Sequence, residues 1–132
     1  GQRIIMAQWE IAGVLVNFFN TPVQVISWQE EGKYLNTRAV ANYFSNFSNF
    51  GKDVVIVACN EHLFRAYKIS EYFGFNPVGS LSTLKFIPWN LFGCDENGYD
   101  NCSSQDWTHN KSIYLLYEIN SRLKLNSLGI IF

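Results

Sequence analysis

The chain has 132 residues, of which 48% are hydrophobic and 17% aromatic, so it is long and apolar enough to form one compact domain with a substantial core. Its 10 basic and 11 acidic residues nearly cancel. That balance argues against nucleic acid as the main partner, because phosphate neutralisation needs a basic surface. No apolar run reaches the roughly 18 residues of a membrane span, so contact with a membrane is expected only through an anchor outside this chain.

The predicted elements alternate between strands and helices along the chain. Short apolar, β-branched runs predict strands, and apolar residues at helical spacing predict amphipathic helices. In chain order we expect a strand at 3–7, a helix at 9–19, a strand at 23–27, a helix at 37–47, a strand at 53–59, a helix at 61–73, a strand within 77–88 and a last helix at 107–125.

Two of these elements give definite expectations about burial. The stretch "DVVIVAC" at 53–59 is continuously apolar, which is the pattern of a strand covered on both faces of a sheet. In the last helix, apolar side chains recur at helical spacing and predict a buried stripe. The members of that stripe are Ile113, Leu116, Tyr117 and Leu123.

The alternation of strands and helices predicts the α/β class. We expect a three-layer, Rossmann-like domain with a mostly parallel sheet of three to five strands joined by crossover helices. The sequence contains no internal repeat and no low-complexity linker, so residues 1–132 are expected to form a single domain.

Polar and ionisable residues gather where each predicted strand leads into a helix. In an open parallel sheet these junctions lie at the carboxyl edge, outside which ligands bind. The first junction contributes Glu10 and the second contributes Thr37. The third junction, after the strand at 53–59, is the richest and contains Cys59, Asn60, Glu61, His62 and Arg65.

The third junction has the features of an anion-binding site. Asn60 is expected to cap the following helix, and His62 and Arg65 lie three residues apart on one helix face. The unpaired N–H groups and partial positive charge of a helix start favour phosphate or carboxylate. We therefore expect Asn60, His62 and Arg65 to bind an anionic small molecule. Thr37 is expected to line the site, and Glu10 or His62 to act as acid or base in any catalysis.

Each of these residues also has a simpler interpretation. His62 could be a solvent-exposed surface histidine, and Arg65 could pair with Glu61 or Glu71. Cys59 is better explained as an inert buried thiol than as a nucleophile, because a Cys and a His three residues apart are weak evidence for thiol catalysis.

At "ACNEHLFRAYKISEYFGF" the chain resembles a bacterial family, the domain-of-unknown-function family that includes SanA, ElyC and YdcF. Members carry a strand, a small-residue turn, a His, two further residues, an Arg-Ala pair and a helix that ends in Gly. His62, Arg65, Ala66 and Gly74 occupy these positions here. Upstream, "IIMAQWEIAGVL" is similar to the family's second strand followed by a helix-opening acid, which is Glu10.

Two further segments extend the resemblance. "YLNTRAVANYF" is similar to a Thr-x-Glu-Asn helix start in which Thr37 matches, although 38–40 depart from the Glu-Asn pair. "WTHNKSIYLLYEINSRL" is similar to the family's closing helix, where Trp107 and Glu118 hold the usual places.

The likeness covers roughly residues 3–124 and has consequences for organisation and location. The family's opening strand, with its glycine-rich turn, has no counterpart, so we expect an N-terminally shortened member that begins at the second strand. The resemblance implies a Rossmann-like fold and, for several relatives, an envelope-associated role with a periplasmic domain; a cytoplasmic location is the alternative. It implies no settled reaction, and the cofactor and the oligomeric state stay open.

Two functions follow from these observations. The first is a small-ligand domain that binds an anion, such as a nucleotide or a phosphate-containing envelope precursor, with hydrolase or transferase chemistry. The alternative is a non-enzymatic protein-interaction domain with a vestigial cleft. In that case the aromatic surface or the segment 89–106 contacts a partner. The missing glycine turn and the altered segment after Thr37 favour this alternative.

The chain has three cysteines, two of which lie in a polar segment near residue 100. Cys94 and Cys102 flank "DENGYDN" and are close enough to form a disulfide; three separate free thiols are the alternative. The segment 95–106 does not fit the EF-hand pattern, because its glycine falls at the fourth position and not the sixth. No Cys/His group has zinc-site spacing, so no metal site is expected.

Overall fold

The computed structural model describes residues 3–31, 33, 35–82, 93–95, 99–103 and 105–130. These residues form a mixed α/β fold, as predicted, with strands and helices alternating over the first two thirds of the chain. The elements are β1 (Met6–Gln8), α1 (Trp9–Phe19), β2 (Val25–Ser27), α2 (Thr37–Ser45), η1 (Ser48–Phe50), β3 (Asp53–Ala58), α3 (Asn60–Tyr72), β4 (Asn76–Ser82), η4 (Asp106–Thr108) and α4 (Lys111–Ser127), where η denotes a 3-10 helix.

The four described strands pair in parallel, as the alternation of strands and helices predicted. β1 pairs with β2 from Met6 and Val25 onward, and β3 pairs with β4 with an irregularity between Val54 and Val55. Within the described residues, however, these are two separate two-stranded sheets. β1 and β2 have only three residues each, so they offer few backbone groups to a shared ladder.

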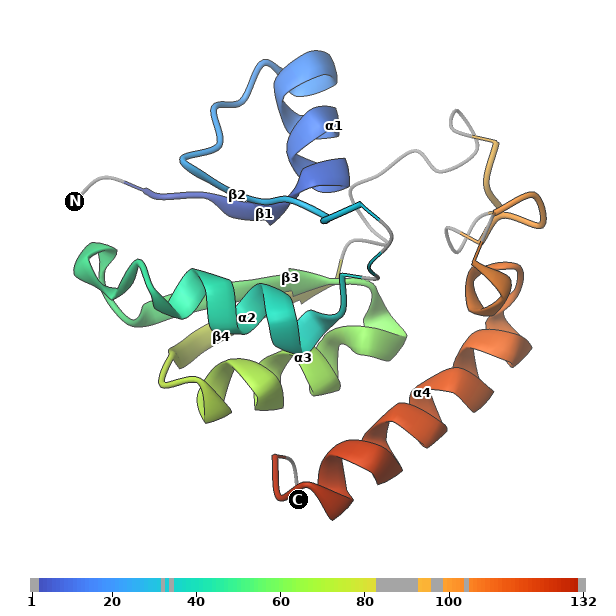
Figure 1. Cartoon of the computed structure of the whole chain (residues 1–132). Coiled ribbons are helices and arrows are strands. Elements are labelled where there is room, and N and C mark those ends of the chain that lie inside the picture. Colours follow the sequence, from blue (N-terminus) through green and yellow to red (C-terminus); the bar gives the residue numbers. More distant parts are fainter. Residues whose placement is uncertain are drawn as a thin grey trace.

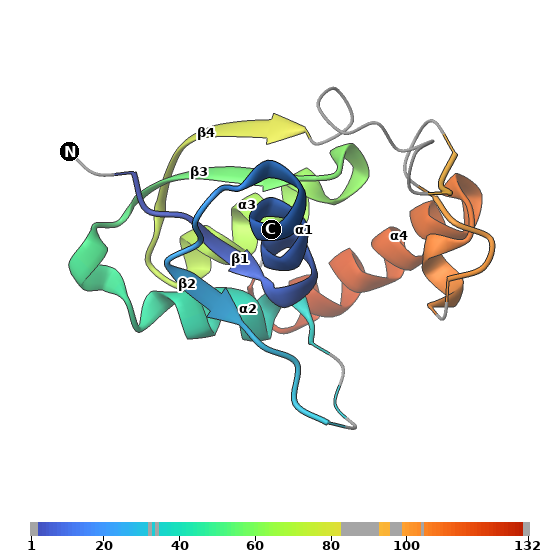
Figure 2. The same ribbon diagram turned by 90° about the horizontal axis from the view of Figure 1, so that it is seen from above.

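The helices lie on opposite sides of the strands. Figure 1 shows α1 on one side of β1 and β2, whereas α2 and α3 lie on the other side. Seen from above, each strand lies beside its parallel partner (Figure 2). α3 packs on both β3 and β4, α2 contacts β2 and α3, and α4 contacts α3.

The buried apolar core lies where α2, α3 and α4 meet. Ile69 of α3 is its centre, with 1% of its surface exposed, and Ala41, Leu125 and Ile130 complete the cluster with Phe73 packed against it. Burial of the Ile69 side chain removes it almost completely from water, which stabilises the fold by roughly 1.5–3 kcal/mol. The core therefore fixes the relative positions of the three helices that carry the candidate site.

The prediction that both faces of the strand at 53–59 are covered was wrong for the described part of the chain. Val55 and Val57 are exposed, the latter by 60%, and they alternate with half-buried Val54 and Ile56. α3 packs on this strand, and no other described element covers the Val55 face well enough to bury it. A continuously apolar run does not by itself reveal how many faces are packed.

The predicted buried stripe of α4 was also wrong in part. Leu116 and Leu123 are 70% and 66% exposed, whereas Tyr114, Glu118 and Leu125 are buried. The helix is turned so that the Glu118 carboxylate meets the Arg65 guanidinium on α3. In another orientation of α4 the buried Arg65 guanidinium would lose its carboxylate partner, which is strongly unfavourable, and apolar spacing alone does not contain that information.

α1 is the most apolar helix and is only partly covered. It runs for 11 residues, and Ala12 is its one fully buried residue. Ile11, Phe18 and Phe19 are exposed, by 48%, 70% and 52% of their surface. None of the helices in the described ranges combines the length and the apolar character that a membrane crossing requires.

Candidate functional site

The start of α3 is arranged differently from the sequence-based expectation. α3 begins at Asn60, and the residue that precedes it as N-cap is Cys59, in extended conformation and without a side-chain cap bond. The prediction that Asn60 caps the helix was therefore wrong, because the chain turns into the helix one residue earlier. Asn60 is exposed, and the His62 N–H donates to the Cys59 carbonyl at 3.0 Å.

A contact between two side chains joins the starts of α2 and α3. Thr37 is the first residue of α2, and its Oγ1 lies 3.1 Å from Nε2 of His62 in the first turn of α3. Asn36 caps α2 by accepting the Ala39 N–H at 2.8 Å. Both helix starts therefore lie close together, so their unpaired N–H groups and partial positive charges act on the same space.

Below this contact lies a buried ion pair between α3 and α4. Nε of Arg65 donates to both carboxylate oxygens of Glu118, at 2.9 and 3.1 Å. Both side chains are almost completely buried. Arg122, one turn further along α4, donates from Nε to Glu118 Oε1 at 3.0 Å and contacts the Glu61 carbonyl at 3.3 Å. Two guanidinium groups thus hold one carboxylate, which satisfies the charge that burial would otherwise destabilise.

His62 extends this group toward solvent. Its Nδ1 lies 3.9 Å from Glu118 Oε2 and makes no hydrogen bond in the described part of the chain, while 17% of the side chain stays exposed. The order Thr37 hydroxyl, His62 imidazole, Glu118 carboxylate runs from the surface into the protein. We call these three residues, with Arg65 and Arg122, the His62 cluster.

The electrostatics of the His62 cluster keep its imidazole neutral near pH 7. Burial lowers the pKa of His62 below its ordinary value of 6.5, and the charges of Arg65 and Arg122 add to this against the opposing Glu118. Burial alone would raise the pKa of Glu118, but His62, Arg65 and Arg122 outweigh it and hold that pKa below 4.5. A neutral imidazole between a hydroxyl and a carboxylate is able to accept a proton.

These shifts predict a pH-dependent stability. Because the His62 pKa is lower in the folded chain than in the unfolded one, the unfolded chain binds the extra proton first as the pH falls below about 6.5. We expect the free energy of unfolding to be highest above that pH and to decrease below it, by at most about 1.4 kcal/mol per pH unit for one proton. Because the Glu118 pKa is also lowered in the folded chain, the free energy of unfolding decreases further below pH 4.5. Urea unfolding between pH 5 and 8 measures the first decrease.

His62→Gln is expected to flatten the profile of unfolding free energy between pH 5 and 6.5. An unchanged profile in His62→Gln would show that another group causes the dependence.

A second group of polar side chains lies beside the His62 cluster. The Cys59 thiol donates to the Tyr114 hydroxyl at 3.7 Å, and burial raises the pKa of Cys59. The thiol is therefore protonated near neutral pH, which supports the interpretation of Cys59 as inert.

The Glu61 side chain is nearly buried, and its Oε1 lies 3.7 Å from Lys111 Nζ. Neither Oε2 of Glu61 nor the Tyr99 hydroxyl has a hydrogen-bond partner among the described residues.

The predicted site residues fall into two groups in the structure. His62, Arg65 and Thr37 are brought together through direct contacts or through Glu118. Glu10 is exposed in the first turn of α1, and no hydrogen bond or ion pair of the described residues links it to His62. Arg65 pairs with Glu118. The alternative that it pairs with Glu61 or Glu71 was therefore wrong.

Two aspartate side chains near Cys94 and Cys102 accept hydrogen bonds from backbone N–H groups. No disulfide joins the two cysteines in the structure, so the bond stays a prediction. Asp95 accepts the Tyr99 N–H at 3.0 Å, and Asp100 accepts the Cys102 N–H at 2.8 Å. Carboxylates engaged in this way shape the turn, and the described residues contain no cluster of three metal-ligating side chains.

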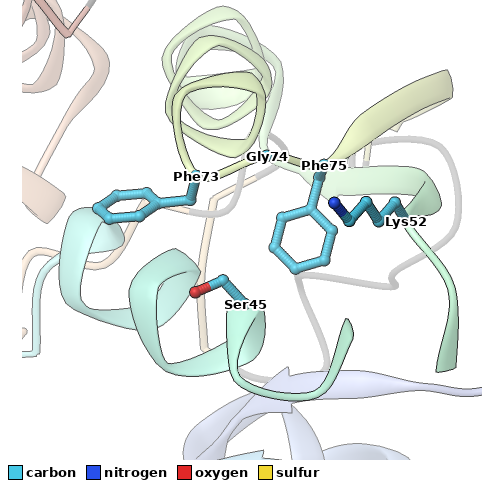
Figure 3. A pocket seen from close by; sticks show the side chains of 5 residues that line it. All are labelled: Ser45, Lys52, Phe73, Gly74 and Phe75. Atoms are coloured by element: carbon cyan, nitrogen blue, oxygen red, sulfur yellow. The ribbon is translucent and has the colours of Figure 1, made fainter. Parts of the chain in front are cut away.

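A surface hollow of about 190 Å³ lies where α2 and α3 end, far from the His62 cluster at their starts (Figure 3). Gly74, with φ of +91° in the left-handed region, follows the end of α3 and lines this hollow. The other lining residues are Ser45, Lys52, Phe73 and Phe75. Thr37 and Ser45 lie at opposite ends of α2, which separates them by roughly 12 Å at 1.5 Å per residue. The hollow is therefore distinct from the His62 cluster.

Glu118, Arg122 and Tyr114 are the site residues that the analysis of strand-to-helix junctions missed. They lie on α4, about 50 residues from the third junction, so no local pattern connects them with His62. The available signal was their spacing: positions 114, 118 and 122 are one turn apart on a single face. In the sequence, Glu118 is singled out only by the family resemblance.

Comparison of the chain with protein-family models, with curated proteins and with solved structures gives no match.

Proposed function

We propose that this chain is a small-ligand domain of the SanA, ElyC and YdcF type that binds an anionic molecule where α2 and α3 begin. The ligand would be a nucleotide or a phosphate-containing envelope precursor. The reaction would be that of a hydrolase or a transferase, and His62 would transfer the proton. The proposal includes the finer fold expected from the sequence, a three-layer Rossmann-like domain; the parallel pairing of all four described strands supports it.

The observation that carries the proposal is the 3.1 Å contact between Thr37 Oγ1 and His62 Nε2. It brings two helix starts together at a partly buried contact, and helix starts favour anions. It also places a neutral imidazole next to a hydroxyl, which is the arrangement that general-base chemistry requires.

The charges around the contact support an anionic ligand. Arg65, Arg122 and Lys111 contribute three positive charges, against two negative charges from Glu61 and Glu118. Only Nε of Arg65 takes part in its pair with Glu118.

A thermal-shift experiment tests the binding. Pyrophosphate, nucleoside monophosphates and sugar phosphates are added to the chain, and a ligand at 100 times its Kd should stabilise the fold by about 2.7 kcal/mol. We expect His62→Ala to abolish the shift and His109→Ala to preserve it. No shift with any anion, or an equal shift in His62→Ala, would contradict the proposal.

A second function, a protein-interaction domain, is favoured by the exposed face of α4. Leu116, Ile119 and Leu123 are each more than half exposed and lie at spacings of three and four residues, which is the pattern of an apolar stripe that meets another surface. Under this function no anion stabilises the chain, so the same thermal-shift experiment separates the two.

A further inference from the structure

Three side chains from three helices form a series of hydroxyl, imidazole and carboxylate. Thr37 Oγ1 is 3.1 Å from His62 Nε2, and His62 Nδ1 is 3.9 Å from Glu118 Oε2. Because a carboxylate faces Nδ1, the favoured neutral tautomer carries its proton on that nitrogen. Nε2 then has a free lone pair, which accepts the proton of the Thr37 hydroxyl.

The carboxylate of this series is held in place from its other side. Arg65 contacts both oxygens of Glu118, and Arg122 contacts one of them. Glu118 therefore has little freedom to turn away from His62. The 3.9 Å gap exceeds hydrogen-bond length by about 1 Å, and such contacts commonly shorten when a substrate closes the site.

We propose that Thr37 is the nucleophile of a covalent transfer, that His62 is its general base and that Glu118 positions His62. The proposal rests on the proposed function and names its substrate class, a phosphoric ester. A nucleophile, a base within hydrogen-bond reach and a third group that orients the base are the parts that such a transfer requires.

The reaction balances with water as the only co-reactant. Thr37 Oγ1 forms a bond to phosphorus while its proton passes to His62 Nε2. The ester P–O bond breaks, and the leaving oxygen takes that proton. Water then attacks the threonine phosphoester, gives a proton to His62, and releases phosphate as Thr37 regains its hydrogen. The unpaired N–H groups at the start of α2 lie next to Thr37, where they stabilise charge on the phosphoryl oxygens.

Labelling with diisopropyl fluorophosphate tests the nucleophile. Attack by Thr37 forms the P–O bond and expels fluoride, and the attached group is located by peptide mass spectrometry. We expect labelling at Thr37 and not at the other threonines. The label should persist in Thr37→Ser and disappear in Thr37→Val, which keeps the shape and removes the hydroxyl. Circular dichroism confirms that Thr37→Val is folded.

Turnover of bis(p-nitrophenyl) phosphate gives a second measurement. Removal of the base in His62→Gln should lower both labelling and turnover by 10²-fold or more, as is usual for general-base catalysis. In Glu118→Gln, measured at a temperature at which circular dichroism shows the variant to be folded, the acid limb of the pH–rate profile should move to lower pH, because a negative charge beside the imidazole is lost. An unmoved limb would remove Glu118 from the series.

The outcomes separate this inference from the proposed function. If pyrophosphate stabilises the wild type but Thr37 is not labelled, or Thr37→Val turns over as wild type, the nucleophile proposal fails and anion binding stands. If Thr37 is labelled but no anion binds, the nucleophile stands and the proposed ligand class fails. Absence of both labelling and binding overturns both.

Discussion

Replacement of Glu118 by alanine is expected to lower the free energy of unfolding by about 3–5 kcal/mol. The side chain is 4% exposed and neutralises Arg65, which is also buried. Its removal leaves the Arg65 guanidinium as an uncompensated charge in a poorly hydrated place, and Arg122 loses the same partner. Most domains of this size have a total stability of 5–15 kcal/mol, so the variant should be close to unfolding. Urea denaturation at pH 7 measures the difference.

Glu71→Ala is the matched control for this substitution. Glu71 also pairs with a cation on its own helix, Lys68 at 3.3 Å, but both side chains are about 40% exposed. Exposed pairs contribute little, because water already solvates both charges. A loss in Glu118→Ala no greater than in Glu71→Ala would mean that the buried pair does not hold α3 and α4 together.

Replacement of Ile69 by alanine is expected to destabilise the chain by about 2–5 kcal/mol. Ile69 is 1% exposed and lies at the centre of the core formed by α2, α3 and α4. Truncation removes its transfer free energy and leaves a cavity that neighbouring side chains fill only in part.

Ile119→Ala makes the same chemical change at an exposed position. Ile119 lies on the open face of α4 with more than half of its surface in solvent. The expected change in the free energy of unfolding is within about 0.5 kcal/mol, which is usual for surface positions. Equal losses at Ile69 and Ile119 would indicate that the α4 face is buried in solution against another surface.

Most of the secondary structure was predictable from local sequence. The helix at 9–19 matches α1 in both bounds, and the other predicted helices agree with α2, α3 and α4 to within a few residues at each end. Apolar periodicity and β-branched runs report local conformation well. The N-cap of α3 was misplaced by one residue because both Cys59 and Asn60 are compatible with a helix start.

The candidate site was only half visible in the sequence. His62, Arg65 and Thr37 could be selected because parallel strands direct their following helices to one edge. The partner of Arg65 could not be selected, since Glu61 and Glu71 are near in sequence while Glu118 is 53 residues away. Side-chain pairing over that distance depends on how helices dock, and local patterns do not report docking.

The sequence by itself determined the alternation of strands and helices and the parallel direction of the strands. Only the tertiary structure decided that α4 turns Glu118 inward and leaves Leu116 and Leu123 in solvent. The physical reason is that a buried guanidinium left without a carboxylate is strongly unfavourable, and this orientation of α4 against α3 supplies the carboxylate. The series of hydroxyl, imidazole and carboxylate is a consequence of that packing.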